Sequence, residues 1–305
     1  MITRYKHKKV TWIDLESPTS EEVRGLLEEF ELPAQVAEEL LLPTVKPRVE
    51  FYENKLVYLI LHFPAFRHTH GGDENQEVDF VIGKDFLITT RYDTIDPLHK
   101  FSKVFEVGNI LDRNDMGEHA GHLFFYMVRK LYKSLEHELE YIRDALRDSE
   151  EDIFSGGERK MVRELSRISR ELINFKQAVR LHQEVLQSFE IAAHRFFGDD
   201  FGYQLRTIIG EYHRIQGSIS INMDTLSELR ETNNSLLSTK QNEIIKVLTI
   251  MTFITAPLSL IAATFGMNTA LAPLSNSPYD FWIILGIMAS AAIMLFSYFI
   301  YKKWL

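Results

Sequence analysis

Cysteine is absent from the 305 residues, which excludes disulfide bonds and metal sites built on thiolates. Also missing are a phosphate-binding G-x-x-x-x-G-K-[ST] loop and any defensible pairing of a nucleophile with a base. We therefore expect neither enzymatic activity nor an organic cofactor.

Basic residues are in deficit, with 34 Lys and Arg against 43 Asp and Glu. Residues 244–305 hold three Lys and one Asp, which leaves 31 basic and 42 acidic side chains, a net charge of −11, in residues 1–243. This balance argues against nucleic acid as a partner. It suits a surface that handles cations, although solubility alone explains most of these charges.

Charges are missing altogether from two stretches near the C-terminus, 247–265 with 19 residues and 281–301 with 21. At about 1.5 Å per residue, each stretch is long enough to cross roughly 30 Å of hydrocarbon. Only an unbroken helix satisfies its own backbone hydrogen bonds there. The sequence therefore predicts a two-helix membrane hairpin, with the lipid bilayer as a partner.

The basic residues near the hairpin predict its orientation. Lys240 and Lys246 precede the first span and Lys302 and Lys303 follow the second, whereas residues 266–280 contain no Lys or Arg. Because basic residues stay on the cytoplasmic side, both termini are expected in the cytoplasm. We expect a multi-pass protein of the cell (inner) membrane.

The rest of the chain changes character at about residue 118. Before it, strand-like stretches at 11–15, 51–63 and 77–92 and a helix start at 17–22 predict an α/β domain. After it, no proline occurs between Pro97 and Pro257, and the pattern predicts helices at roughly 118–152, 158–197 and 203–265. The expected breaks are Ser155-Gly156-Gly157 and Gly198-Asp199-Asp200.

The third long helix carries two stripes. Its cytoplasmic part repeats mainly apolar residues at steps of four and three, as a helix packed against its neighbours does: Ile208, Tyr212, Ile215, Ile219, Asn222, Leu226, Leu229, Asn233 and Leu236. A second stripe, of mainly small or hydroxyl-bearing residues, enters the membrane span: Asn242, Ile245, Thr249, Thr252, Ala256, Ser259 and Ala263.

Such a stripe has two explanations: a close contact between helices, or a surface that faces water in a pore. Towards the cytoplasm it continues through Ser238, Ser235, Glu231, Glu228 and Asp224. A surface that becomes acidic as it leaves the membrane favours a funnel for cations. Because two helices enclose no lumen, a pore requires several copies arranged in a ring.

The end of the first span resembles the CorA family of divalent-cation channels. The family's hallmark, Gly-Met-Asn at the outer end of the penultimate membrane helix, matches Gly266-Met267-Asn268, and a Pro257-Leu258 pair precedes it. Trp12-Ile13-Asp14-Leu15 and Lys46-Pro47-Arg48-Val49-Glu50 resemble the family's cytoplasmic domain. The resemblance covers essentially the whole chain.

This resemblance implies a homopentamer that takes up Mg2+ passively, with Co2+ and Ni2+ as further substrates. The selectivity motif would be Gly266, Met267 and Asn268, with Asn268 contacting the ion through its bound water, Gly266 permitting a helix-ending turn and Met267 packing against it. Ile245 and Leu248 would form apolar collars near the inner mouth.

The implied organisation has six parts. They are a cytoplasmic α/β domain (1–117), long cytoplasmic helices forming a funnel or stalk (118–243), a pore-lining span (244–265), an extracytoplasmic loop (266–280), a second span (281–301) and a basic tail (302–305).

Two features of the resemblance concern ions. Cytoplasmic carboxylates in the family sense Mg2+ and close the ring, and candidates here are Asp79, Asp96, Asp199, Asp200 and Glu211. The loop after the tripeptide carries one acid, Asp280, and its Pro-Leu, Asn-x-Pro and Phe-Trp pattern resembles the zinc-transporting ZntB branch. A Zn2+ transporter of the same architecture is therefore the alternative, and a helical membrane-anchored scaffold or sensor without a pore is another.

Overall fold

The computed structural model describes residues 1–52, 55–64, 75–92, 95–110, 119–267 and 279–302. The chain divides into two compact units, Met1–Arg230 and Glu231–Leu305. The helix α7, Asp199–Gly266, is continuous from the first unit into the second. The division into six segments proposed above remains a prediction.

The first unit contains a six-stranded sheet in the order β1-β2-β6-β5-β4-β3. The strands are β1 (Ile2–His7), β2 (Val10–Glu16), β3 (Arg48–Tyr52), β4 (Leu56–Phe63), β5 (Gln76–Ile82) and β6 (Phe86–Arg91). β2 and β6 run parallel, and every other neighbouring pair is antiparallel. The sequence stretches 51–63 and 77–92, each predicted to be strand-like, therefore each contain parts of two antiparallel strands. Backbone hydrogen bonds donated by Lys55 and by Gly83 close the turns between these strands.

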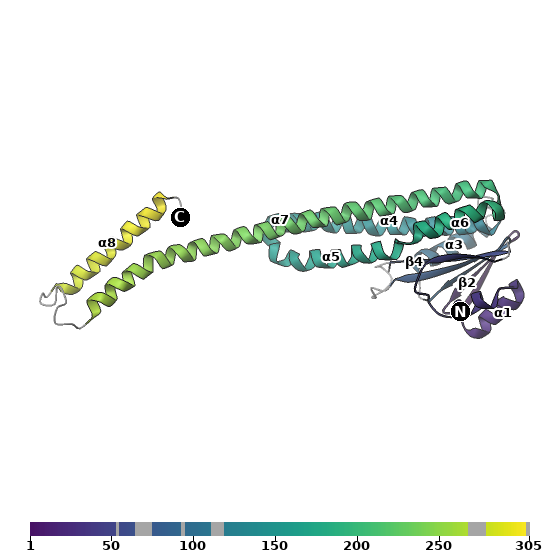
Figure 1. Ribbon diagram of the computed structural model, residues 1–305, viewed down its shortest axis with the longest axis horizontal. Helices are drawn as coiled ribbons and strands as arrows, with labels where there is room; N and C mark the ends of the chain where they lie inside the picture. Colours follow the sequence, from purple (N-terminus) through teal and green to yellow (C-terminus); the bar gives the residue numbers. More distant parts are fainter. Residues whose placement is uncertain (53–54, 65–74, 93–94, 111–118, 268–278, 303–305) are drawn as a thin grey trace. The chain divides into compact units, whose positions relative to one another are not determined.

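Two short helices, α1 (Ser20–Phe30) and α2 (Ala34–Glu39), cover one face of the sheet (Figure 1). α1 begins as predicted, because Thr19 and Glu22 form a reciprocal capping box. A single apolar core joins the two layers: Ile13, Leu15, Val23, Leu26, Val36, Leu40, Tyr58, Ile60, Val81 and Ile88.

Helices cover the other face of the sheet (Figure 1): α3 (Asp96–Ile110), α4 (Ala120–Asp152), α5 (Glu158–Val179) and α6 (His182–Phe197). Trp12 joins this layer to the sheet. It is fully buried, lies 5.6 Å from the ring centroids of both Phe101 and Phe105, and donates its Nε1–H to Thr89 Oγ1 at 3.0 Å.

The helix breaks occur near the predicted positions, with two corrections. A π-helical turn, Ile153–Gly157, separates α4 from α5, and Gly156 there has a φ of 98° that other residues rarely adopt. The expected helix 158–197 is divided at Arg180 and Leu181, which contain no glycine or proline. The third helix begins at Asp199 instead of about residue 203: Gly198, with a φ of 91°, is the break, and Asp199 and Asp200 lie in the first helical turn, where acids are favoured.

In the second unit, α8 (Asp280–Tyr301) runs back beside the C-terminal part of α7 (Figure 1). Within the described residues, α7 and α8 are the two helices long and apolar enough to cross a membrane. Only 6% of the apolar window of each helix is buried, unlike the core helix of a soluble domain. Their side chains are therefore left to meet lipid or other copies of the chain.

Candidate ion-conduction surface

One face of α7 packs within the hairpin. Ile250 is 3% exposed, and the half-buried residues that follow it recur at steps of four and three: Ile254, Leu258, Ile261 and Phe265. On α8, Phe299 is 6% exposed, and its ring lies 6.4 Å from that of Phe253, which lies beside this face of α7 and is 60% exposed. We infer that this face of α7 is the one that α8 covers.

The small and hydroxyl-bearing stripe lies on the opposite side of the same helix. At 100° per residue, its centre is about 180° from the centre of the α8-covered face. Its members are exposed apart from the half-buried Thr249: Asn242, Ile245, Thr249, Thr252, Ala256, Ser259 and Ala263. Leu248, a predicted pore-lining residue beside the stripe, is also exposed. The stripe is therefore not the seam of the intrachain hairpin, so any helix that packs against it must come from another copy.

The threonine hydroxyls of the stripe have intrahelical partners. Thr249 donates to the carbonyl of Ile245 at 2.7 Å, and Thr252 donates to that of Leu248 at 2.9 Å. Each hydroxyl proton is thereby satisfied inside the helix, and the oxygen lone pairs remain as acceptors. Such a surface accepts hydrogen bonds from the water shell of a cation.

The outer end of α7 is described as far as Met267. α7 ends at Gly266, and the φ of Gly266 lies outside the left-handed range. A Cβ on Gly266 would meet no atom within 4 Å, and Met267 is 60% exposed. Asn268 lies outside the described residues. The ion-selecting role of these three residues therefore stays a prediction.

The predicted cytoplasmic seam of α7 is confirmed by burial. Ile208, Ile215 and Ile219 are at most 3% exposed, and Asn222, 4% exposed, donates its Nδ2–H to the carbonyl of Leu139 in α4 at 3.1 Å. All five residues of the acidic stripe are exposed: Asp224, Glu228, Glu231, Ser235 and Ser238. At 100° per residue this stripe also lies roughly opposite the packed face.

Asp79 is the most buried of the candidate regulatory carboxylates. It is 0% exposed on the sheet face covered by α1 and α2, and the hydroxyls of Tyr58 and Tyr92 donate to its Oδ2 at 3.0 and 3.4 Å. Burial, followed by the neighbouring Glu77 carboxylate, raises the pKa of Asp79 well above its usual value. An enclosed carboxyl with a raised pKa is poorly placed to meet an ion from solution.

The other candidates are not gathered into one site. Asp199 and Asp200 lie together in the first turn of α7, where the Asp199 carboxylate contacts His194 Nδ1 at 3.0 Å. Glu211 accepts the Nε–H of Arg129 at 2.8 Å, and Asp96 begins α3. Among the described residues, no group of three or more His, Asp or Glu is arranged to hold a metal.

Sequence reasoning missed two features of these surfaces. The α8-covered face of α7 escaped it because Ile, Leu and Phe are equally suited to lipid and to a neighbouring helix. The tyrosine partners of Asp79 escaped it because they come from different strands. Strand alternation was the available signal for Tyr58 and Asp79, since it places them on the same face as their core neighbours Ile60 and Val81.

Comparison with known proteins agrees with this architecture. The cobalt/magnesium transport protein CorA of Thermotoga maritima is 25% identical over 299 residues, which cover 97% of this chain and 83% of the relative. The solved structure of the complete CorA magnesium transporter of Methanocaldococcus jannaschii superposes with a TM-score of 0.84 at 20% identity, over 99% of this chain and 93% of that one.

A further fold match is the ZntB cytoplasmic domain of Vibrio parahaemolyticus, with a TM-score of 0.63 at 14% identity, over 76% of this chain and 90% of that domain. Residues 7–303 match the family described as "CorA-like Mg2+ transporter protein". That match extends over nearly the whole chain and includes both membrane helices. The chain therefore belongs to the family of CorA-like Mg2+ transporter proteins, a family of transporters and not of enzymes.

Proposed function

We propose that this chain forms a homopentameric channel through which Mg2+ enters the cytoplasm, with Co2+ and Ni2+ as further substrates. The observation that carries the proposal is the exposed stripe of α7, which lies opposite the face that α8 covers and becomes acidic towards the cytoplasm. Five copies of α7, each with its stripe towards a common axis, enclose a polar pore. Five copies of α8 then lie outside, against lipid.

The geometry of one subunit supports assembly into a ring. The contacts around such a ring are heterologous, because each copy uses one side of α7 against a different side of the next. A glycine at the end of α7 suits this arrangement, since no described residue occupies the space where a Cβ would lie. Close approach of a neighbouring copy is then the reason for Gly266.

Charge supports the direction of flow. Asp224, Glu228 and Glu231 give each subunit three exposed carboxylates on the stripe, so a ring concentrates negative charge at the cytoplasmic mouth. A membrane potential that is negative inside drives two charges inward with about 4.6 kcal/mol per 100 mV. We place the protein in the inner membrane with both termini in the cytoplasm, which agrees with the lysines flanking the hairpin.

Selection of the ion is assigned to Gly266, Met267 and Asn268. Mg2+ gives up its waters slowly, so a ring of asparagine amides that contacts the hydrated ion permits faster passage than a dry site. Cytoplasmic Mg2+ would regulate the channel through carboxylates. Of the named candidates, Asp199 and Asp200 have exposed side chains, whereas the enclosure of Asp79 disfavours it.

Zn2+ is the second candidate ion. Two observations favour it: the fold match with a ZntB cytoplasmic domain, and a single acid in residues 266–280. Uptake into proteoliposomes loaded with a Mg2+-sensitive or a Zn2+-sensitive dye separates the two. Mg2+ influx that follows the imposed potential is the expected result, and passage of Zn2+ without Mg2+ would reject the first choice.

Substitution of the selectivity asparagine tests whether there is a pore at all. Asn268→Ala should abolish Mg2+ influx and growth complementation in a strain that lacks Mg2+ uptake, while the protein still reaches the membrane. Asn276→Ala, an asparagine of the same loop outside the tripeptide, is the matched control. Unchanged flux in Asn268→Ala would instead favour a membrane-anchored scaffold or sensor.

A further inference from the structure

A cavity of about 650 Å³ lies in the first unit, between α3, α4 and α7. α3 contributes Phe101 and Val104, and α7 contributes Glu211, Arg214 and Ile215. The remaining lining comes from one side of α4. The volume falls within the roughly 300–1,000 Å³ that small-molecule sites occupy. Glu211, a candidate regulatory carboxylate of the transport proposal, lies in this lining, and the pore stripe contributes no residue to it.

The cavity concentrates positive charge in an acidic protein. It is lined by four cations, Arg129, Lys130, Lys133 and Arg214, and by two acids, Glu136 and Glu211. Its net charge is therefore +2, whereas residues 1–243 as a whole carry −11. A local excess of this sign, inside a hollow of the surface, is suited to a multiply charged anion.

The cations differ in how they are engaged. Arg129 donates its Nε–H to Glu211 at 2.8 Å, and its guanidinium lies 5.3 Å from the ring centroid of Phe125, so this side chain is already held in place. No ion pair joins Lys130, Lys133 or Arg214 to another described residue. These three are thus available to phosphate oxygens, beside a fixed arginine that has further donors.

The same cavity has an apolar and aromatic side. Phe101, Leu123, Tyr132 and Ile215 are each at most 8% exposed, and they form a wall that carries no charge. Tyr126 stands at its edge with 36% of its surface exposed. An exposed aromatic ring beside an apolar wall is suited to a flat heterocycle, which stacks on one and is shielded by the other.

We propose that this cavity binds a nucleoside polyphosphate, with the phosphates on Lys130, Lys133 and Arg214 and the base against Tyr126 and the apolar wall. The ligand class follows from the joint presence of the two sides, because an inorganic anion would leave the aromatic side unused and a neutral ring would leave the cations unpaired. Binding of a nucleotide at this site would act on the first unit. The proposal does not depend on whether the chain conducts Mg2+.

Calorimetric titration of the purified full-length protein in detergent tests the proposal, with ATP, pyrophosphate and adenosine as separate probes in EDTA. We expect saturable binding of ATP, tighter than that of pyrophosphate or adenosine by about tenfold or more, the factor that corresponds to about 1.4 kcal/mol. Absence of saturable ATP binding would overturn the proposal. Equal affinities for ATP and pyrophosphate would overturn the nucleotide assignment.

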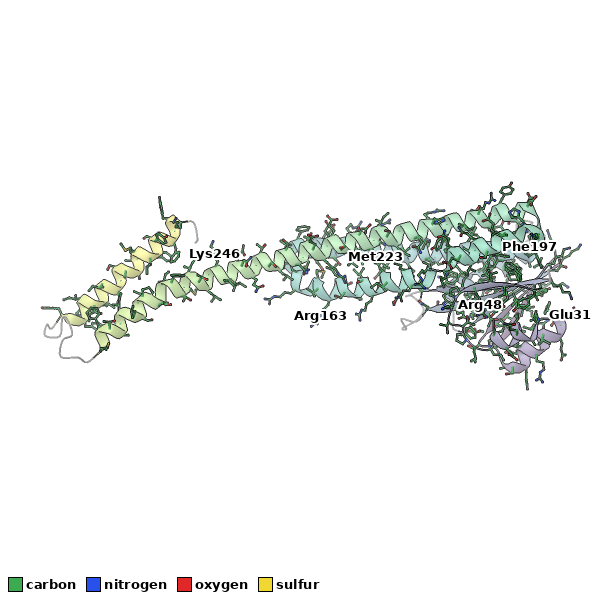
Figure 2. The ribbon with its side chains drawn as sticks, in the orientation of Figure 1. Glu31, Arg48, Arg163, Phe197, Met223 and Lys246 are labelled. Carbon is green, nitrogen blue, oxygen red and sulfur yellow. The ribbon has the colours of Figure 1, made fainter. Side chains whose placement is uncertain are left out.

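Variants locate the site. The double variant Lys130→Ala/Lys133→Ala should weaken ATP binding by about tenfold or more, since hydrogen bonds to charged groups contribute on that scale. Lys160→Ala/Arg163→Ala removes the same charge from exposed positions of α5 (Figure 2) and should leave the affinity unchanged. Equal weakening in both would mean diffuse charge attraction and no site.

A third variant tests the aromatic side. Tyr126→Leu should weaken ATP binding and leave pyrophosphate binding as it was, whereas a purely electrostatic site would show no difference between the two probes. Because Tyr126 is partly exposed and its side chain makes no hydrogen bond with another described residue, the fold should tolerate the change. Circular dichroism and elution volume confirm the fold of each variant before titration.

Discussion

The buried histidine His182 should make the stability of the first unit depend on pH. It is 0% exposed at the start of α6, and its Nε2 lies 2.7 Å from the carbonyl oxygen of His62. Because a carbonyl only accepts, Nε2 carries the proton, and Nδ1 then accepts from the Tyr132 hydroxyl at 2.7 Å. Both ring nitrogens of the neutral imidazole are thus satisfied, and a second proton on Nδ1 would displace the hydrogen bond that the Tyr132 hydroxyl donates.

Burial lowers the pKa of His182 to about 3 from its usual 6.5. In the unfolded chain the group takes up a proton below about pH 6.5, while the folded form stays neutral until about pH 3. The unfolded state therefore binds more protons as the pH falls, and stability is lost from about pH 6.5 downwards. Each pH unit costs up to about 1.4 kcal/mol, or about 2 kcal/mol by pH 5.

Denaturation by urea of the full-length protein in detergent measures this loss as the difference in the free energy of unfolding between about pH 7 and about pH 5. His182→Gln keeps a donor and an acceptor without a titrating ring, so its free energy should fall by about 2 kcal/mol less than that of the wild type. His213→Gln, which replaces an exposed histidine, is the control and should follow the wild type. Parallel curves for His182→Gln and the wild type would refute the buried neutral imidazole.

Further substitutions at Thr89, Thr19 and Gly266, two of them with a control, test local structure. Thr89→Val removes the acceptor of the Trp12 indole N–H and the donor to Asp14, and should cost about 1–3 kcal/mol in urea denaturation. Its neighbour Thr90→Val, whose buried hydroxyl has no partner among the described residues, should be neutral or stabilising. Thr19→Ala breaks the capping box of α1 and should cost about 1 kcal/mol, whereas Thr19→Ser should retain most of it. Gly266→Ala should leave the free energy of unfolding within about 0.5 kcal/mol, because its Cβ meets no atom of the described residues, yet reduce Mg2+ influx where copies approach closely.

The helices and membrane spans could be predicted because their signals are periodic or compositional. A charge-free stretch of about 20 residues has few structural interpretations other than a membrane span. The stripe of α7 repeats at helical spacing over about ten turns. The break between α5 and α6 could not be predicted, since Arg180 and Leu181 carry no helix-breaking signal. Neither could the pairing of β2 with β6, because residues 11–16 and 86–91 are brought together by tertiary packing and no local turn links them.

The candidate carboxylates show the same limit at the level of the site. The sequence alone does not distinguish Asp79 from Asp199. In the structure, Asp79 is enclosed beneath two tyrosines, whereas Asp199 is exposed at the start of a helix. Burial depends on which strand face a residue occupies and on what covers that face. The polar stripe was easier to predict from the sequence, because its exposure and its periodic spacing are both properties of a single helix.

The absence of cysteine permits the most direct test of the central claim, that the stripe of α7 lines a water-filled pore. Single cysteines are introduced at Thr252, Ala256 and Ser259 on the stripe and at Ile254, Leu258 and Ile261 on the α8-covered face, with no native thiol to remove. Mg2+ influx into proteoliposomes is then measured before and after addition of a positively charged thiol reagent that does not cross lipid. The account predicts that influx is blocked at the stripe positions and unchanged at the α8-covered ones. Equal reaction on both faces, or block confined to Ile254, Leu258 and Ile261, would contradict it.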